Sequence, residues 1–386
     1  MEIELGKGKK VRRAYGFDEI ALVQSLKTID PDDVDTTVKI GNIKITTPII
    51  ASAMDSVVNP TTAILMSQYG GIGVLNLQGI QTRYEDSDSI LDKIANASRE
   101  EYVPLMQEIY SKPIKKSLIQ KRISQIKEKN AIAAVSLIPQ SAEEFGPIAA
   151  KAGADLIVIQ ATVVSTIHKS NTYKTLNLEK FCKEMKVPVI VGNCVTYEVA
   201  LSLMETGVAA ILVGIGPGAA CTSRGVLGIG VPMATAIADC AGARDAYFKK
   251  SGKYVSVIAD GGMVVGGDIC KAIACGADAV MIGSPLAKAK EAPGRGYHWG
   301  MATPNATLPR GTRIKVGTIG TLKEILLGPA KYDDGSQNFL GALKTSMGTL
   351  GAETIKEMQN VEIVIAPSLL TEGKVFQKAQ QLGMYK

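Results

Sequence analysis

One cysteine stands at the end of a glycine-rich loop, in the stretch LVGIGPGAACTSRG at residues 212–225. Gly214, Gly216 and Gly218 occupy alternate positions before Cys221, with a proline among them. Glycine and proline weaken regular helix and strand, so this run is predicted to be a tight loop with exposed amides and carbonyls. A thiol carried by such a loop can act as a nucleophile on a ligand bound beneath it. The alternative is that Cys221 is a small residue that only fills the loop.

Two further glycine-bearing turns point to an anion and a diol. The stretches IADGG (258–262) and IGS (282–284) each end a short apolar run. Gly261 and Gly262 allow backbone amides to approach an anion closely, and Ser284 adds a hydroxyl donor. The carboxylate of Asp260 can accept hydrogen bonds from both hydroxyls of a ribose. A phosphate site beside a diol site describes a nucleoside monophosphate, whereas DGG alone is also an ordinary turn with a helix cap.

The composition sets the class of protein. The chain has 386 residues, of which 46% are hydrophobic and 21% charged, and 39 are glycine, which is typical of an α/β enzyme. No apolar run is long enough to span a membrane, the net charge of +6 is mild, and the basic residues within 112–129 follow helical spacing. We therefore expect a cytoplasmic protein that binds neither membrane nor nucleic acid. Six cysteines without a CxxC pair and only two histidines indicate reduced thiols and no zinc site.

Eight short apolar runs recur along the chain, most of them followed by a segment with helical periodicity. They are continuous rather than alternating, as expected for parallel strands covered by helices. The predicted strands span residues 48–52, 71–75, 131–137, 155–160, 188–192, 209–213, 255–259 and 277–282. Eight βα units predict an α/β protein that forms a closed (β/α)₈ TIM barrel, with its active site at the C-terminal ends of the strands. The competing fold is a doubly wound open sheet, but no GxGxxG follows the first strand.

Two regions exceed a minimal barrel within the single catalytic domain predicted for residues 1–386. Residues 78–130 are polar and helical, and they are too long for a simple connection. We expect them to form a small helical excursion after the second strand. Residues 286–350 are rich in Gly, Pro and Thr and follow the last strand. They are predicted to form a flap over the active site, and the alternative is a disordered surface insertion.

Several stretches, in the same order along the chain, resemble the IMP dehydrogenase/GMP reductase family. They are GFDEIALV (16–23), TPIIASAMDSVV (47–58), GGIGVLN (70–76), VIVGNCVT (189–196), VGIGPGAACTSR (213–224), VIADGG (257–262), GGDICKAIACGADAVMIGS (266–284) and HWGMA (298–302). The resemblance covers nearly the whole chain. The pair of regulatory CBS domains that typically interrupts IMP dehydrogenases is missing, since residues 78–130 are too few to contain it. The chain is most similar to a divergent subfamily without CBS domains.

The resemblance implies a mechanism and a set of site residues. Cys221 would attack C2 of IMP, hydride would pass to NAD⁺, and water would hydrolyse the resulting thioimidate to XMP. Ribose and phosphate would be bound by Ser52, Asp260, Gly261, Gly262, Gly283 and Ser284, and the base by Met54, Gly300 and Met301. Gly218 would also contact the substrate. Cofactor binding would fall to Gln160, Thr162, Asn193 and Gly214. Carbonyl groups of Gly216, Gly218 and Cys221 would bind K⁺. The family also suggests a homotetramer or an octamer.

The sequence departs from the family at several of these positions. The serine that usually donates to phosphate two residues before the cysteine is Ala219, while Ser223 keeps the hydroxyl of the usual threonine. His298 replaces a tyrosine that reaches the phosphate, and could bind it as a donor or as a cation. Gln160 replaces the acidic residue that recognises the nicotinamide ribose. The Arg-Tyr pair that activates water in dehydrogenases is not visible.

The last departure bears on the choice between two reactions. GMP reductase uses a glutamate to handle the departing ammonia, and Arg310 falls at that position. An arginine could instead orient or deprotonate water, or it could be a surface residue in a salt bridge. The leading hypothesis is therefore an NAD-dependent IMP dehydrogenase with Cys221, Ser223 and Arg310 as catalytic residues. The alternatives are an NADPH-dependent GMP reductase and a non-catalytic barrel that binds purine nucleotides.

Overall fold

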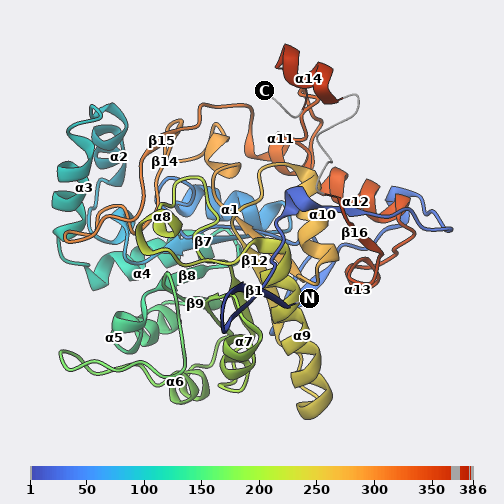
Figure 1. The fold of residues 1–386 in the computed structure, drawn as a ribbon. Helices are drawn as coiled ribbons and strands as arrows, with labels where there is room; N and C mark the ends of the chain where they lie inside the picture. The colour runs from blue at the N-terminus through green and yellow to red at the C-terminus, as the bar shows by residue number, and fades with distance from the viewer. Residues whose placement is uncertain (1, 367–373, 382, 384–386) are drawn as a thin grey trace.

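A computed structural model describes residues 2–366, 374–381 and 383, and it contains a closed barrel of eight parallel strands (Figure 1). The predicted ends of the 1–386 domain, residues 1 and 384–386, lie outside the described residues. The barrel strands are β6 (Ile49–Ala51), β7 (Ile72–Asn76), β8 (Ala134–Leu137), β9 (Leu156–Gln160), β10 (Val189–Cys194), β11 (Ala210–Val213), β12 (Ser256–Asp260) and β13 (Ala279–Ile282). β13 pairs with β6 to close the barrel, with Met281 beside Ile50. The predicted (β/α)₈ fold is confirmed.

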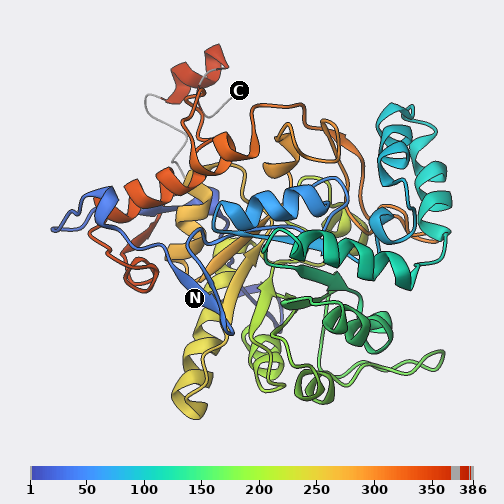
Figure 2. The ribbon, with the colours of Figure 1, turned by 180° about the vertical axis from the view of Figure 1, so that it is seen from behind.

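The strands are short and apolar because both of their faces are covered. Every residue of β7, β8, β10, β11 and β13 is buried, which explains why the sequence lacks alternation. The covering helices are α1 (Pro60–Gln68), α4 (Lys116–Lys127), α5 (Pro139–Lys151), α6 (Leu178–Glu184), α7 (Tyr197–Met204), α9 (Met233–Ser251) and α10 (Gly266–Ala274). Their arrangement around the sheet is visible from both sides of the molecule (Figures 1 and 2). No helix in the described ranges is long and apolar enough to cross a membrane.

The segment 78–130 divides into two parts. Its last helix, α4, packs between α1 and α5 and so takes the place of a regular barrel helix. The remaining elements are η3 (Ile80–Thr82), α2 (Ser87–Asn96) and α3 (Tyr102–Ser111). These three elements surround a small apolar cluster of their own, centred on Trp299 and including Ile80, Leu91 and Met106. The excursion therefore has a separate core, to which the segment after β13 contributes its tryptophan.

The segment 286–350 contains ordered elements and has two roles. Its elements are η4 (Leu286–Lys288), β14 (Tyr297–His298), β15 (Ile314–Lys315), α11 (Leu322–Leu327) and α12 (Phe339–Thr349). The first half crosses the C-terminal end of the barrel, where Cys221 forms an antiparallel bridge with Gly311. The second half lies outside the barrel, where α12 packs against α10. Only the first half can therefore act as a flap over the site.

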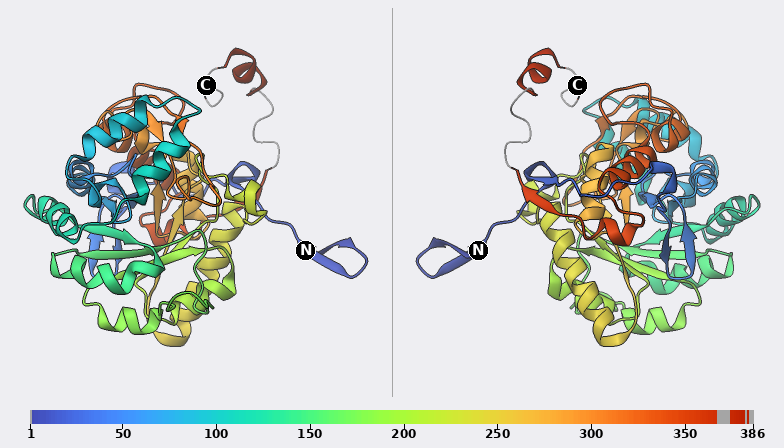
Figure 3. Two further views of the ribbon diagram at one scale, coloured as in Figure 1. Left: turned by 90° about the vertical axis from the view of Figure 1, so that its left-hand side faces the viewer. Right: turned by 90° about the vertical axis from the view of Figure 1, so that its right-hand side faces the viewer.

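Of the remaining elements, α8 (Ser223–Leu227) follows the cysteine loop at the C-terminal end of the barrel. The others are β1 (Glu2–Gly6), β2 (Lys9–Arg12), η1 (Phe17–Glu19), β3 (Ile20–Leu22), η2 (Pro31–Asp33), β4 (Val38–Ile40), β5 (Ile43–Ile45), α13 (Ile355–Met358), β16 (Ile363–Ile365) and α14 (Lys374–Gln380). The β1–β2 hairpin and α14 stand away from the barrel (Figure 3). β16 pairs with β3, which joins the two ends of the chain beside α10.

Candidate active site

A cavity of about 710 Å³ opens at the C-terminal end of the barrel. Its size is in the range of pockets that bind nucleotide-sized ligands. All the predicted site residues line it: Ser52, Met54, Gln160, Thr162, Asn193, Gly214, Gly216, Gly218, Cys221, Ser223, Asp260, Gly261, Gly262, Gly283, Ser284, His298, Gly300, Met301 and Arg310. They come together because parallel strands end at the same edge of the barrel. Within the described ranges no cluster of three or more His, Cys, Asp or Glu side chains could hold a metal ion.

The cysteine loop follows β11 and packs closely on the end of β12. Gly214 has φ of +146°, and a Cβ there would lie 2.4 Å from the carbonyl oxygen of Asp260. The loop then closes on itself, since the Cys221 amide donates to the Gly218 carbonyl over 3.0 Å. Glycine is required at position 214 both for its backbone angle and for the close approach. This contact fixes the loop that carries the thiol next to the predicted ribose site.

Cys221 is distinct from the other cysteines. Of the six, all in the described ranges, it is the one that lines the cavity, and its side chain is half-buried. Burial raises the pKa of Cys182 and Cys270 to about 11 and that of Cys275 to about 12. A buried thiol with a raised pKa is a poor nucleophile. The structure therefore leaves Cys221 as the candidate nucleophile.

The segment at residues 302–312 covers the cysteine loop. The Arg310 carbonyl oxygen lies 4.0 Å from the Cys221 Sγ and accepts a hydrogen bond from the Thr222 amide over 3.5 Å. The Arg310 Nε and the Ser223 Oγ are both buried without a hydrogen-bond partner. Buried polar atoms are nearly always hydrogen-bonded, so two such atoms on residues that line the cavity indicate groups that meet a ligand. Arg310 thus lies in the cavity wall rather than in a surface salt bridge.

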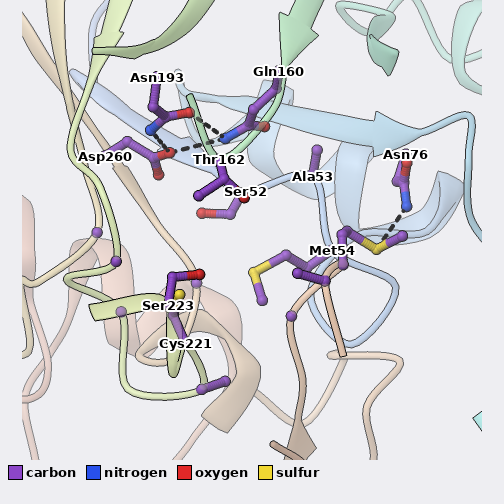
Figure 4. Close-up of a pocket in the computed structure, with 18 of the residues that line it drawn as sticks. Ser52, Ala53, Met54, Asn76, Gln160, Thr162, Asn193, Cys221, Ser223 and Asp260 are labelled. Carbon is purple, nitrogen blue, oxygen red and sulfur yellow. Dashed lines mark hydrogen bonds between the residues drawn. The ribbon is translucent and has the colours of Figure 1, made fainter. Parts of the chain in front are cut away.

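The carboxylate of Asp260 is held by two amide side chains (Figure 4). Its Oδ2 accepts from Asn193 Nδ2 over 2.8 Å and from Gln160 Nε2 over 2.9 Å. Desolvation raises the pKa of Asp260 to about 6, against the lowering effect of these two hydrogen bonds. Gln160 and Asn193, which the sequence assigns to cofactor binding, are therefore bonded to the predicted ribose-binding group. Asn193 also donates to the Gly214 carbonyl and so links the carboxylate to the cysteine loop.

His298 lines the cavity as a neutral side chain. Burial lowers its pKa to about 4, which favours the predicted alternative of a neutral hydrogen-bond donor over that of a cation. Ser56 Oγ lies 3.0 Å from His298 Nδ1 and also accepts a bond from the Trp299 amide. The hydroxyl has two lone pairs, so it can donate to Nδ1 or accept from it, according to the tautomer of the imidazole. A Cβ on Gly283 would lie 3.4 Å from Nε2, so this ring nitrogen is next to the predicted phosphate turn.

The cysteine loop contains both the carbonyl groups assigned to K⁺ and a nearby arginine. Gly216 and Gly218 carry carbonyl groups of the kind that bind K⁺, so the donor set fits the ion. Arg224 is a second source of positive charge here, because its Nε donates to the Ile215 carbonyl over 3.0 Å. A Cβ on Gly216 would lie 2.9 Å from the Arg224 side chain. The loop therefore carries a fixed cation of its own beside the carbonyls assigned to K⁺.

Four residues that the sequence analysis did not single out also belong to this site. Gln78, Arg83 and Tyr110 line the cavity from the excursion, and Asp55 is completely buried directly behind Met54. Asp55 lies within the stretch TPIIASAMDSVV, which resembles the family but assigns no role to Asp55 itself. Gln78 and Arg83 lie in turns on either side of η3, and Tyr110 lies in α3, whose sequence indicates an amphipathic helix and nothing more. No signal in the sequence connects them to the cysteine loop.

Comparisons with known proteins agree with this geometry. The IMP dehydrogenase / GMP reductase domain model matches residues 14–375. An uncharacterized oxidoreductase of Mycolicibacterium smegmatis is 38% identical over 94% of this chain and 99% of its own. Inosine-5'-monophosphate dehydrogenase of Cryptosporidium parvum is 31% identical over 95% of this chain and 96% of its own. The crystal structure of an IMP dehydrogenase/GMP reductase-like protein from Corynebacterium glutamicum is 39% identical with a TM-score of 0.89, covering 94% and 97% of the two chains. This chain therefore belongs to the IMP dehydrogenase / GMP reductase family of oxidoreductases.

Proposed function

We propose that this protein is an IMP dehydrogenase, which oxidises IMP to XMP with NAD⁺ through a covalent intermediate on Cys221. The observation that carries the proposal is the position of one half-buried thiol in a nucleotide-sized cavity that the carboxylate of Asp260 also lines. As a thiolate, Cys221 would attack C2 of the purine, so that C2 loses a hydride and a thioimidate remains on sulfur. Water then adds to the thioimidate, and departure of the thiol leaves XMP.

The surrounding residues have separate tasks in this proposal. Asp260 accepts the ribose hydroxyls, while the backbone amides of Gly262 and Gly283 and the Ser284 hydroxyl hold the phosphate. The unpartnered Oγ of Ser223 would donate to the substrate or to the water near the thioimidate. The unpartnered Nε of Arg310 would orient that water.

The bound groups complete the site. NAD⁺, when bound, supplies the hydride acceptor, and Thr162 and Gly214 line the part of the cavity nearest Gln160 that would hold it. K⁺ would be held by the carbonyls of Gly216, Gly218 and Cys221, where its charge would stabilise the loop. By family resemblance we also propose a homotetramer or octamer in the cytoplasm.

The proposed function is tested by absorbance at 340 nm. A rise with IMP and NAD⁺ is expected, since NADH is formed. A fall with GMP and NADPH would instead identify a GMP reductase, and no change in either assay would identify a barrel that only binds purine nucleotides.

The nucleophile is tested separately with Cys221→Ala. This variant should bind IMP as the wild type does and form no NADH above background, because it cannot make the thioimidate. Mass spectrometry of wild type with IMP and NAD⁺ should locate a nucleotide adduct on Cys221. An adduct found only on Cys182 or Cys275 would overturn the assignment.

A further inference from the structure

A chain of hydrogen bonds runs behind the cavity wall from the excursion to the barrel. Trp299 Nε1 donates to the Tyr110 hydroxyl over 3.0 Å, and that hydroxyl donates to Asp55 Oδ2 over 2.7 Å. The same carboxylate oxygen accepts from the Ile80 amide over 3.1 Å. Asp55 and Trp299 are both 0% exposed. The phenol of α3 thus connects a buried carboxylate of the barrel to an indole of the flap segment.

Tyr110 is the member of this chain that reaches the cavity. It lines the cavity together with Met54 and Gly300, which are the chain neighbours of Asp55 and Trp299. Met54 lies among the labelled residues on the side of the cavity facing Cys221 (Figure 4). The resemblance assigns Met54 and Gly300 to the purine base. Tyr110 therefore lines the same cavity as the residues that the resemblance assigns to the base and as Cys221.

The charged groups around this chain of hydrogen bonds favour the transfer of a proton. Asp55 Oδ1 has no hydrogen-bond partner, and desolvation raises the pKa of Asp55 to about 6. Burial and the Asp55 charge raise the pKa of Tyr110 well above its ordinary value, so the phenol keeps its proton at rest. Arg83 is the cation that acts on both groups, and His298, joined through Ser56 to Trp299, is neutral. The carboxylate can therefore take up one proton near neutral pH.

A proton acceptor is what the proposed reaction still lacks. Addition of water to the thioimidate releases one proton, and an arginine such as Arg310 is a poor acceptor because a guanidinium holds its proton tightly. We propose, on the basis of the proposed function, that Tyr110 accepts this proton while its own phenolic proton passes to Asp55. One O–H bond of water breaks, the water oxygen bonds to C2, and the proton that appears on Asp55 balances the step. Tyr110 is then a catalytic residue, and Asp55 acts through it.

The competing explanation for these hydrogen bonds is that they only hold the excursion against the barrel. Tyr110→Phe removes the hydroxyl and keeps the ring, and Tyr84→Phe is a matched control. Tyr84 belongs to the same excursion, and its hydroxyl donates over 3.1 Å to the carbonyl of Ile109, the residue before Tyr110. A loss of anchoring would affect both variants, whereas a loss of proton transfer would affect only Tyr110→Phe.

The experiment follows NADH formation in the pre-steady state with IMP and NAD⁺. Hydride transfer precedes hydrolysis, so Tyr110→Phe should retain a burst of NADH whose amplitude counts the folded active sites. The steady rate per active site should fall about 100-fold or more, as expected when a general base is lost. Tyr84→Phe should retain both the burst and the steady rate. In wild type the steady rate should fall as pH decreases through about 6, and in Asp55→Asn it should be low at every pH.

Each failure has its own meaning. A normal steady rate in Tyr110→Phe, an equal loss in Tyr84→Phe, or a burst lost in proportion to the steady rate would each overturn the role of Tyr110. If wild type forms no NADH from IMP, the proposed function fails and the proton acceptor fails with it. If wild type shows a burst and only the Tyr110 results disagree, the dehydrogenase proposal stands without this acceptor.

Discussion

Asp260 and Asp55 are two carboxylates at the same end of the barrel with similar acidity and different neighbours. Burial raises the pKa of each to about 6. Asp260 lines the cavity and accepts hydrogen bonds from the amide groups of Asn193 and Gln160. Asp55 is hidden behind the wall and accepts a hydrogen bond from the phenol of Tyr110.

We infer from the difference between these hydrogen-bond donors which carboxylate binds the substrate and which one accepts a proton. An amide donor does not release its proton, so Asp260 is a fixed acceptor whose free lone pairs suit the hydroxyls of a ligand. A phenol can release a proton when it gains one from elsewhere, so Asp55 can be the end of a proton path. In the proposal, carboxyl groups of similar pKa therefore have two functions, according to whether the hydrogen-bond donor is an amide or a phenol.

The largest effect expected from this comparison is the loss of IMP binding in Asp260→Ala. Two charge-assisted hydrogen bonds to ribose would be lost, each contributing roughly 1.5–3 kcal/mol. The Kd for IMP should therefore rise by about 100-fold or more in calorimetry. 2′,3′-Dideoxy-IMP, which lacks both hydroxyls, should bind wild type and variant about equally. Normal IMP binding by the variant would show that Asp260 is only a turn residue and does not bind the ribose.

A somewhat smaller effect is expected at Arg310. This residue lines the cavity, and its proposed task is to orient water rather than to bind ribose or accept a proton. If its guanidinium orients water, Arg310→Ala should retain the NADH burst and slow the steady rate by about 100-fold, as misplacement of a reactant does. Arg310→Lys should restore little, because an ammonium lacks the planar fork of donors. A steady rate unchanged in Arg310→Ala would show that the water is held by other groups. Unlike Asp55→Asn, the alanine variant should keep the dependence of the steady rate on pH.

The two carboxylates also differ in how far the sequence reveals them. The eight apolar runs predict the barrel because burial on both faces leaves a continuous pattern. Asp260 is visible because it stands in a DGG turn at a strand end, and Cys221 because glycines precede it. These features are local, so spacing along the chain is enough to find them.

Asp55, Tyr110 and Trp299 are far apart in the sequence, and only packing brings them together. The excursion has its own apolar core, and its contribution to the cavity depends on how that core docks on the barrel. Helical periodicity predicts α3 and cannot predict which of its tyrosines faces a buried aspartate. The neutral state of His298 was likewise not predictable, because it depends on burial rather than on residue type.

A modest pH effect on substrate binding should distinguish the two carboxylates. Ribose hydroxyls require Asp260 in its charged form, so the Kd for IMP should rise as pH falls below about 6. The expected change is about tenfold per pH unit below that value, since each pKa unit corresponds to about 1.4 kcal/mol. Asp55→Asn should leave this dependence in place, because Asp55 does not line the cavity. Titration of IMP from pH 5 to pH 8 in wild type and in Asp55→Asn would measure it.

The last expected effect concerns stability, and it tests the buried carboxylate without any substrate. The pKa of Asp55 is raised in the folded protein from 3.8 to about 6, so between these values the folded state binds more protons than the unfolded state. The free energy of unfolding should therefore fall as pH rises through that window, and the loss should persist above pH 6. A shift of about two units corresponds to about 3 kcal/mol as an order of magnitude.

Asparagine at this position resembles the protonated acid, because it is neutral and can still accept the hydrogen bonds from Tyr110 and the Ile80 amide. Asp55→Asn should thus be more stable than wild type by about 1 kcal/mol near pH 4.5 and by about 3 kcal/mol at pH 7.5. Urea unfolding at the two pH values measures this difference directly. Asp260 titrates in both proteins and cancels in the comparison. If the variant were less stable than wild type at both pH values, the carboxylate of Asp55 would be satisfied in the folded protein, and its place as the end of a proton path would be lost.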